Sequence, residues 1–336
     1  MIYTDVLIAG SGITGSLIAK YLIKERISKV LTIDPSGTWG GIYFSSTRLC
    51  NIVMNRIPLF VNHDEKSIIE NVLEIPLLCM DLKPTIIKEG DVGRKVLTSY
   101  AIEDFQNPWF LKWGNASCLI EGVLDNYIMI PSSKPIPSTI RALDSEKSIA
   151  ILRSNAVINY KYLIWTAPLP ELIKSLRRKS PSLRSLAKRL KWVNSYIVAL
   201  CLEGKKPRWT LAYHGTKATR AHTFVTKFYD NYYALYIIAS FSDREKPLPG
   251  FTEKLISDVK RLQIIPTPFK IRDERTFIIT YSILNKIPSE DIRPLVSELE
   301  SKNIMLVGRS ATWKELSIGS IFHEVKKVVE KVIGFI

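Results

Sequence analysis

The feature that most constrains the fold is a glycine-rich turn close to the start of the chain. Residues 3–9 form an apolar run typical of a strand, residues 10–15 read Gly-Ser-Gly-Ile-Thr-Gly, and residues 16–24 carry apolar side chains at helical spacing. A second apolar run at 30–33 ends in Asp34. Strand, glycine turn, helix and strand form a β-α-β unit, which predicts an α/β fold with a parallel central sheet.

Each glycine of this turn has a mechanical role. Gly10 allows the tight turn, Gly12 lets the backbone approach a pyrophosphate, and Gly15 lets the helix pack closely on the sheet. The start of the helix offers unpaired N–H groups and a positive dipole end to phosphates. Asp34 can accept hydrogen bonds from ribose hydroxyls, and an acid at this place disfavours the 2′-phosphate of NADP. The sequence therefore predicts a dinucleotide site.

The segment after the second strand narrows the choice of dinucleotide. Residues 34–41 read Asp-Pro-Ser-Gly-Thr-Trp-Gly-Gly. This acid-x5-Gly-Gly pattern resembles that of flavoproteins of the glutathione-reductase-like superfamily. In those proteins the second glycine pair, here Gly40 and Gly41, passes under FAD.

A second match lies near the other end of the chain. Residues 304–307 form an apolar run that ends in Gly308-Arg309, Trp313 follows in a loop, and a helical pattern begins near Ser317. This segment resembles the C-terminal FAD motif of the amine oxidase, protoporphyrinogen oxidase and UDP-galactopyranose mutase relatives. Arg309 has the donors to bind a phosphate or a flavin carbonyl. Residues 161–172 resemble the segment where the chain of those relatives leaves the FAD domain.

The resemblance implies a Rossmann-type FAD-binding domain with a parallel central sheet, and a substrate domain of antiparallel sheet and helices. The FAD-binding domain would comprise residues 1–62, 115–167 and 290–336, and the substrate domain residues 63–114 and 168–289. The residues expected to contact FAD are Gly10, Gly12, Ile13, Thr14, Gly15, Asp34, Pro35, Gly40, Gly41, Thr166, Gly308, Arg309, Trp313, Ser317, Ile318 and Ser320.

Apolar periodicity predicts the remaining elements. Helices are expected over residues 117–127, 168–190, 251–262 and 317–333. Strands are expected over residues 139–144, 149–153, 156–159, 162–166, 193–202, 223–229, 232–242, 277–284 and 304–307.

The resemblance implies two kinds of flavin chemistry. In the oxidases the flavin takes a hydride from a substrate held in an aromatic-lined pocket, whereas in the mutases reduced flavin acts as a nucleophile on a sugar nucleotide. After Lys314 this chain has Glu315-Leu316, where the mutases carry tyrosines that bind substrate phosphates. We therefore expect FAD-dependent oxidation of a small or lipid-like organic molecule. A mutase and a non-catalytic FAD-binding subunit are the alternatives.

The catalytic residues are not identifiable from the sequence. Arg220, His222 and Tyr281 are the weak candidates. No metal site is expected, because the four histidines are isolated and the four cysteines show no ligand spacing. We interpret Cys50, Cys79, Cys118 and Cys201 as small buried hydrophobic side chains. The aromatic residues expected near the pocket are Trp39, Tyr43, Phe44, Tyr196, Phe224, Tyr236, Tyr281 and Trp313.

Charge and hydropathy limit the cellular context. The chain of 336 residues has 47 basic and 32 acidic side chains and a net charge of +15. No apolar run approaches the roughly 20 residues of a spanning helix, and the first residues lack a signal-peptide pattern, so we expect a cytoplasmic protein. The basic stretch 174–191 favours a solvated face, or a contact with an anionic membrane or an acidic protein. Nucleic acid is not expected, and a homo-oligomer or a partner subunit would complete the short substrate domain.

Overall fold

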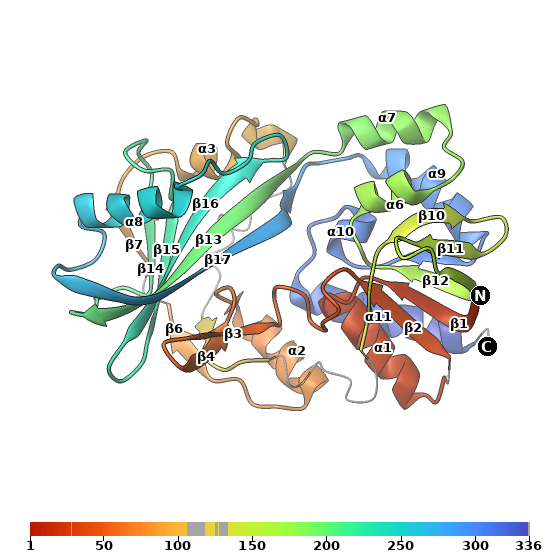
Figure 1. Cartoon of the computed structure of the whole chain (residues 1–336), viewed down its shortest axis with the longest axis horizontal. Coiled ribbons are helices and arrows are strands. Elements are labelled where there is room, and N and C mark those ends of the chain that lie inside the picture. Colours follow the sequence, from red (N-terminus) through yellow and green to blue (C-terminus); the bar gives the residue numbers. More distant parts are fainter. Residues whose placement is uncertain (28, 83, 106–117, 125–126, 128–133, 335–336) are drawn as a thin grey trace.

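The computed structural model describes residues 1–336 except 28, 83, 106–117, 125–126, 128–133 and 335–336. Figure 1 shows two sheets at opposite ends of an elongated molecule. Both termini lie beside the sheet that contains residues 2–9. After the sites that the sequence predicts in them, we call the part around the parallel sheet the nucleotide half and the part around the antiparallel sheet the substrate half. The α/β class and the pairing of a parallel with an antiparallel sheet are confirmed.

Within the described residues, the sheet of the nucleotide half has seven strands, of which β1, β2, β12, β18 and β9 run parallel. The strands β10 and β11 extend it as an antiparallel hairpin beside the start of β12. The two short strands predicted before residue 167 form one strand, β12. The bounds are β1 (Ile2–Ala9), β2 (Val30–Asp34), β9 (Ile136–Pro137), β10 (Ile140–Asp144), β11 (Ile149–Leu152), β12 (Val157–Trp165) and β18 (Ile304–Leu306).

Alternate side chains of β1 enter two different hydrophobic layers. Val6 and Ile8 pack with α1 (Ile13–Lys24) and α11 (Ile318–Ile333), whereas Leu7 and Ala9 pack with the helices of the opposite face. The helices of that opposite face are α6 (Leu169–Ser175), α7 (Pro181–Arg189), α9 (Ser289–Glu300) and the short α10 (Arg309–Thr312). Side chains of α6 and α7 share this core, and the domain boundary expected at residue 168 stays a prediction.

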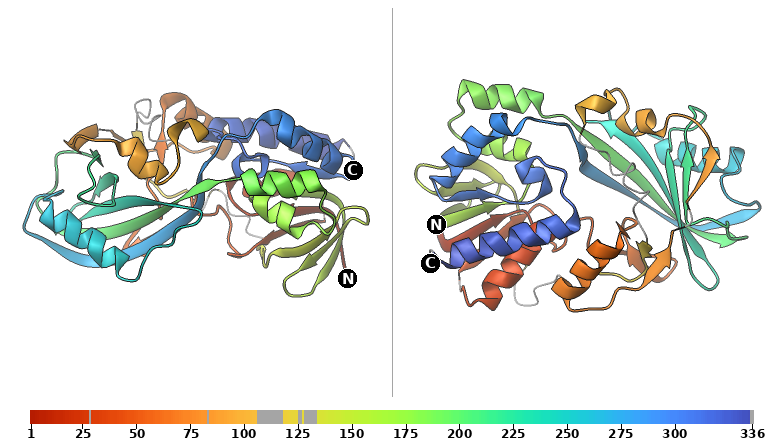
Figure 2. Two further views of the ribbon diagram at one scale, coloured as in Figure 1. Left: turned by 90° about the horizontal axis from the view of Figure 1, so that it is seen from above. Right: turned by 180° about the vertical axis from the view of Figure 1, so that it is seen from behind.

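The substrate half is built on a sheet whose described strands are six, in the order β17-β13-β16-β15-β14-β7. One face is covered by α8, and the other faces residues 46–81, 92–105 and 118–120, as the two orientations of Figure 2 show. The predicted strand 277–284 is the end of a longer strand, β17. The bounds are β7 (Pro84–Lys88), β13 (Trp192–Gly204), β14 (Leu211–His214), β15 (Thr223–Phe228), β16 (Tyr233–Ser242), β17 (Phe269–Leu284) and α8 (Phe251–Arg261).

The segment between β2 and β9 covers the inner face of the substrate sheet. Its elements are β3 (Ser46–Leu49), β4 (Ile52–Asn55), β5 (Phe60–Val61), α2 (His63–Leu73), β6 (Cys79–Asp81), α3 (Val92–Leu97), the 3₁₀ turn η1 (Ile102–Asp104) and β8 (Cys118–Ile120). The expected helix over 117–127 is wrong over residues 118–124, because residues 118–120 form β8, which pairs with both β5 and β6, whereas Tyr127 is helical. The buried ammonium of Lys227 donates to the carbonyls of Ile120 and Glu121 and fastens this segment to the sheet.

The cysteines are paired, contrary to the interpretation as separate buried thiols. Cys50 is bonded to Cys201, and Cys79 to Cys118, with Cα–Cα distances of 6.2 and 5.4 Å. Positions 151 and 39 residues apart in sequence are brought together by the tertiary fold, which spacing along the chain does not reveal. Disulfides are rare in the reducing cytosol outside hyperthermophiles, so this pairing does not support the expected cytoplasmic location.

Within the described residues, no helix has both the length and the apolar character needed to cross a membrane.

Candidate functional site

A cavity of about 960 Å³ lies between the two halves, large for a small-molecule site. On the nucleotide side it begins where β1, β12 and β18 end, at Gly12, Thr166 and Arg309. On the substrate side its wall includes Ile197 and Ile238. Ligands of parallel α/β sheets bind at the carboxyl ends of the strands, so the position suits a ligand site.

The first glycine turn combines tight internal packing with an open face. Gly10 has φ +106°, and a Cβ added to Gly15 would lie 1.9 Å from the carbonyl oxygen of Gly10. Gly12, in contrast, lines the cavity, and a Cβ added there meets no atom within 4 Å. Gly10 and Gly15 therefore hold the strand, turn and helix together, while Gly12 leaves room for a ligand against the backbone.

The second glycine pair lies against the first turn. Gly40 has φ +86°, and its N–H donates to the carbonyl of Ser11 and the hydroxyl of Ser16, both at 2.9 Å. A Cβ added to Gly41 would lie 3.1 Å from the Cα of Gly12. Because Gly40 and Gly41 also line the cavity, the two motifs form one continuous backbone floor free of side chains.

Asp34 lies at the end of β2, where its carboxylate orders the turn. One oxygen accepts the N–H of Ser11 at 2.9 Å, and the other accepts the N–H and the hydroxyl of Ser36 at 2.8 and 2.5 Å. Asp34 is half-buried and Pro35 is exposed, and neither lines the cavity. Contact of these two residues with a ribose stays a prediction.

Two helix N-termini border the cavity. Ile13 and Thr14 begin α1, and Ser317 and Ile318 begin α11. The hydroxyl of Ser317 accepts the N–H of Ser320 at 3.1 Å, which caps α11. Unpaired N–H groups and the positive end of each helix dipole favour an anion at this end of the cavity.

The turn of Gly308 joins these two helix starts. Gly308 has φ +88°, and a Cβ added there would lie 2.6 Å from the hydroxyl oxygen of Thr14. A side chain at this position would push the C-terminal turn away from α1. Gly308 therefore fixes how the motifs from the two ends of the chain meet.

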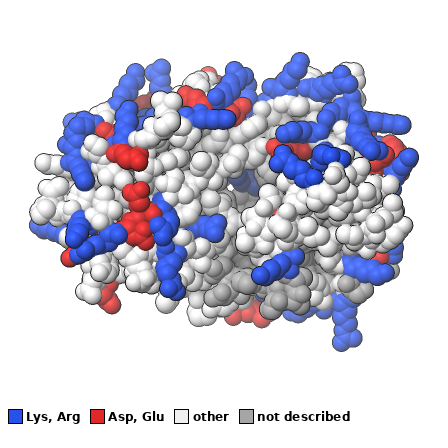
Figure 3. Space-filling view, viewed as in Figure 1, with Lys and Arg blue, Asp and Glu red and all other residues white. Residues whose placement is uncertain are grey.

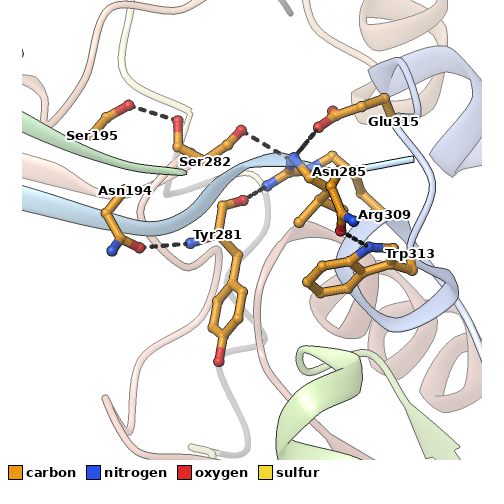
Figure 4. A network of polar contacts seen from close by, with 9 residues as sticks. Asn194, Ser195, Tyr281, Ser282, Asn285, Arg309, Trp313 and Glu315 are labelled. Atoms are coloured by element: carbon orange, nitrogen blue, oxygen red, sulfur yellow. Dashed lines mark hydrogen bonds and ion pairs between the residues drawn. The ribbon is translucent and has the colours of Figure 1, made fainter. Parts of the chain in front are cut away.

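Arg309 reaches across the cavity wall to the substrate half (Figure 4). Its guanidinium lies 3.2 and 3.3 Å from the two carboxylate oxygens of Glu315, and it donates to the carbonyls of Ser282, at 3.1 Å, and Tyr281. Glu315 also accepts the N–H of Leu284 at 2.9 Å. Arg309 thus directs both terminal nitrogens of its guanidinium to protein groups, and it ties the turn after β18 to the bulge of β17.

The carbonyls that Arg309 binds belong to an irregularity in β17. Val193 pairs with Ile283 and Ser195 pairs with Ile279, so residues 280–282 face the single residue Asn194. Within this bulge Tyr281 has φ +60°, a backbone conformation unusual for a bulky side chain. The bulge turns all three of its residues to the cavity wall.

Tyr281 and Trp313 belong to an aromatic cluster with Trp192. The Tyr281 ring lies 4.5 Å from that of Trp192, and its hydroxyl donates to Glu171 at 3.3 Å. Burial and the Glu171 charge raise the pKa of Tyr281 above its usual value. Trp313 is 1% exposed, donates its ring N–H to Asn285 at 3.0 Å, and does not line the cavity. Trp313 packs behind the wall, and its contact with FAD stays a prediction.

Two of the three catalytic candidates lie away from the cavity. His222 is fully buried, with ring nitrogens 2.8 and 3.0 Å from the hydroxyls of Thr223 and Ser240, and Arg220 pairs with Glu245 at 3.2 Å. Burial, and then the charges of Lys95 and Arg220, lower the pKa of His222 to about 3. Neither residue lines the cavity. Of the three, only Tyr281 has access to a ligand there.

Of the residues expected to contact FAD or to lie near the pocket, some line the cavity and others lie behind its wall. The cavity wall contains Gly12, Ile13, Thr14, Gly40, Gly41, Thr166, Arg309, Ser317 and Ile318, and of the aromatic candidates Tyr43, Phe44 and Tyr281. Gly10, Gly15, Gly308 and Ser320 support this wall from behind.

Several wall residues were not foreseen, among them Ser195, Ser282 and Glu65. Glu65 has a sequence signal only for its helix-capping role with Asn62. Among the described residues, no group of three His, Cys, Asp or Glu side chains is placed to hold a metal ion.

The fold has close counterparts among solved structures. A reduced UDP-galactopyranose mutase superposes with a TM-score of 0.77 at 12% identity, over 99% of this chain and 96% of that one. A fatty acid isomerase from P. acnes that produces CLA gives 0.66 at 13% identity, over 98% of both chains. A putrescine oxidase variant gives 0.63 at 9% identity, over the whole of both chains.

The chain therefore shares its fold with these solved structures, as the two glycine motifs predicted. No protein-family profile and no curated protein sequence matches it.

Proposed function

We propose that the protein is a flavoenzyme that binds FAD in this cavity and oxidises a small or lipid-like organic substrate. The observation that carries the proposal is the floor formed by Gly12, Gly40 and Gly41, which leaves the cavity open along the backbone. Two helix N-termini border the same space, which suits the pyrophosphate of a dinucleotide. The superfamily fold supports FAD as that dinucleotide.

Different residues would bind different parts of FAD. Gly12, Ile13 and Thr14 would hold the pyrophosphate, and Asp34 the ribose of the ADP part. Ser317 and Ile318 would offer N–H groups to the flavin half. When bound, FAD supplies a two-electron acceptor for hydride. The apolar side chains of the substrate sheet keep water out of the reacting end of the cavity.

The experiment that tests this proposal is a visible spectrum of the protein purified without added cofactor. We expect the bands of oxidised flavin, and FAD in the supernatant after denaturation. Reduction of the bound flavin by an electron donor, followed by reoxidation in air, would support a redox enzyme. A colourless protein that also fails to bind added FAD would contradict the proposal, and a flavin that no donor reduces would favour the non-catalytic subunit.

A flavin mutase is the second candidate, because the mutase superposition covers nearly the whole chain. Glu315 speaks against it, since this carboxylate pairs with Arg309 on the cavity wall. Addition of UDP to the flavin-loaded protein discriminates between the two. An oxidase without a sugar-nucleotide site leaves the flavin spectrum unchanged, whereas a mutase shows a saturable shift.

We also propose that the basic stretch 174–191 contacts an anionic membrane surface or an acidic protein. Lys174, Arg178, Arg184 and Lys188 are exposed on and around α6 and α7, and Figure 3 shows Lys and Arg side chains gathered along this edge. Reversal of the charges at Arg184, Lys188 and Arg189 is expected to abolish association with anionic liposomes. Unchanged association would contradict the proposal. Assembly with a second copy or a partner subunit stays a proposal that light scattering can test.

A further inference from the structure

The charges on the cavity wall are unusual for a protein with 47 basic residues. Among the described lining residues the charged side chains are one cation, Arg309, and two carboxylates, Glu65 and Glu315. Arg309 is held by both oxygens of Glu315 and by two backbone carbonyls. The wall therefore presents no uncompensated positive side chain to a ligand.

Because the only cation of the described wall is paired with a carboxylate, the wall disfavours an anionic ligand beside the dinucleotide. A phosphate removed from water needs Arg or Lys donors, or the N–H groups of a helix start. The helix starts at Ile13 and Ile318 border the glycine side of the cavity, where the dinucleotide would lie. A second phosphate group, on a substrate, finds only Arg309, and Glu315 neutralises it.

The substrate side of the cavity is a chamber of aliphatic side chains. Ile197 and Ile238 are direct neighbours on β13 and β16, and Ile279 lies on β17 next to Ser195. The segment 57–60 supplies further apolar lining residues. These surfaces favour an apolar ligand.

One polar feature interrupts this chamber. The hydroxyl oxygens of Ser195 and Ser282 lie 2.7 Å apart, and both residues are buried and line the cavity. Two hydroxyls carry two protons, of which this bond uses one. The pair therefore retains one donor and several lone pairs for an uncharged oxygen of a ligand.

We infer that the substrate side binds an uncharged, largely apolar molecule that carries an alcohol or carbonyl oxygen, and that the Arg309–Glu315 pair excludes phosphorylated ligands from it. The oxygen meets the Ser195–Ser282 pair while the apolar remainder packs on Ile197, Ile238 and Ile279. The inference rests on the proposed function in that FAD occupies the glycine side.

The test compares 1-octanol with octyl phosphate, which share a chain and differ in the head group. Equilibrium dialysis against the flavin-loaded protein is expected to give at least tenfold tighter binding of 1-octanol. Equal or tighter binding of octyl phosphate would overturn the inference, as would a failure of 1-octanol to bind while the flavin spectrum is intact. A protein that holds no FAD overturns the proposed function instead, and with it the premise that the glycine side is occupied.

Glu315→Gln tests the exclusion itself. Glutamine keeps an oxygen for the N–H of Leu284 but no longer neutralises Arg309. We expect octyl phosphate to bind about tenfold tighter than to the unsubstituted protein, with 1-octanol binding changed by less than about twofold, given that tenfold equals 1.4 kcal/mol of binding free energy.

Glu65→Gln is the matched control. It removes a carboxylate from the same wall and keeps an oxygen for the N–H of Asn62. An equal gain in octyl phosphate binding in both variants would overturn the role of the Arg309–Glu315 pair. The comparison of the two ligands on the unsubstituted protein does not depend on how either variant folds.

Discussion

The two halves of this protein line the cavity with different groups, one with backbone atoms and the other with side chains. The nucleotide half contributes backbone, namely glycine turns such as Gly12 and Gly41 and the first N–H groups of two helices. The substrate half contributes side chains such as Ser195 and Ile197 on β13, Ile238 on β16 and Ile279 on β17, which are long strands. A backbone site depends on short contiguous motifs, whereas a side-chain site depends on strand register. The two halves should therefore respond differently to substitution.

The largest effect is expected from the disulfide that fastens the substrate half. Replacement of Cys50 and Cys201 by Ala opens a link between positions 151 residues apart. The loss of this constraint on the unfolded chain should lower the free energy of unfolding by about 5 kcal/mol. Urea denaturation of the oxidised proteins measures it. The Cys79→Ala, Cys118→Ala pair is the control, with about 4 kcal/mol expected for its shorter loop of 39 residues. Unchanged midpoints would show that the links form no part of the folded protein.

The junction of the halves is tested by Arg309→Met. The substitution leaves Glu315, whose side chain is 17% exposed, and the carbonyls of Tyr281 and Ser282 without their donor. We expect a loss of about 3 kcal/mol in the free energy of unfolding. Arg309→Lys, which keeps the charge, should lose less. An effect below about 0.5 kcal/mol would show that this contact does not hold the halves together.

The backbone site is tested by two alanine substitutions in one turn. Gly12→Ala points a methyl group into the cavity, where it meets no protein atom, so the stability of the cofactor-free protein should stay within about 0.5 kcal/mol. FAD binding should weaken at least tenfold, because the methyl group occupies the floor.

Gly15→Ala is the contrasting variant. Its methyl group would meet the carbonyl of Gly10, so it should cost about 2–3 kcal/mol of stability. Thermal unfolding and FAD titration separate the two effects. If Gly12→Ala binds FAD normally, the proposed floor is not the cofactor site.

The smallest effect concerns the buried His222 of the substrate half. Its pKa is about 3 in the folded protein and near the ordinary 6.5 when unfolded, so the unfolded chain binds the extra proton between these values. Stability contributed by the neutral ring is present above pH 6.5 and is lost as the pH falls toward 3. Between pH 7 and pH 5 this amounts to about 2 kcal/mol.

His222→Gln should remove this part of the pH dependence while keeping a hydrogen-bonding side chain. Urea midpoints measured at pH 7 and pH 5 for both proteins test it. The same pH dependence in both proteins would contradict the assignment to His222.

The part of the fold that the sequence predicted is local in origin. The turn from Gly10 to Gly15, the pair Gly40-Gly41 and the turn at Gly308 each depend on a few adjacent residues, and all three lie where expected. The strands β13, β15 and β16 were also predicted, because β-branched and aromatic residues run along them without interruption.

The errors share a cause. The expected helix over 117–127 fails because β8 is short and is defined by its partners β5 and β6. The cysteine pairs and the bulge at residues 280–282 join segments that are distant in sequence.

The sequence by itself therefore determined the parallel-sheet architecture and the glycine floor, because the conformation of each turn follows from residues that are neighbours in the chain. The tertiary structure alone decided that Glu315 neutralises Arg309 and that Ser195 meets Ser282. The second of these contacts depends on strand register, and a bulge one residue longer or shorter would turn different side chains into the cavity. The chemistry offered to a substrate is thus set by the packing of the two halves.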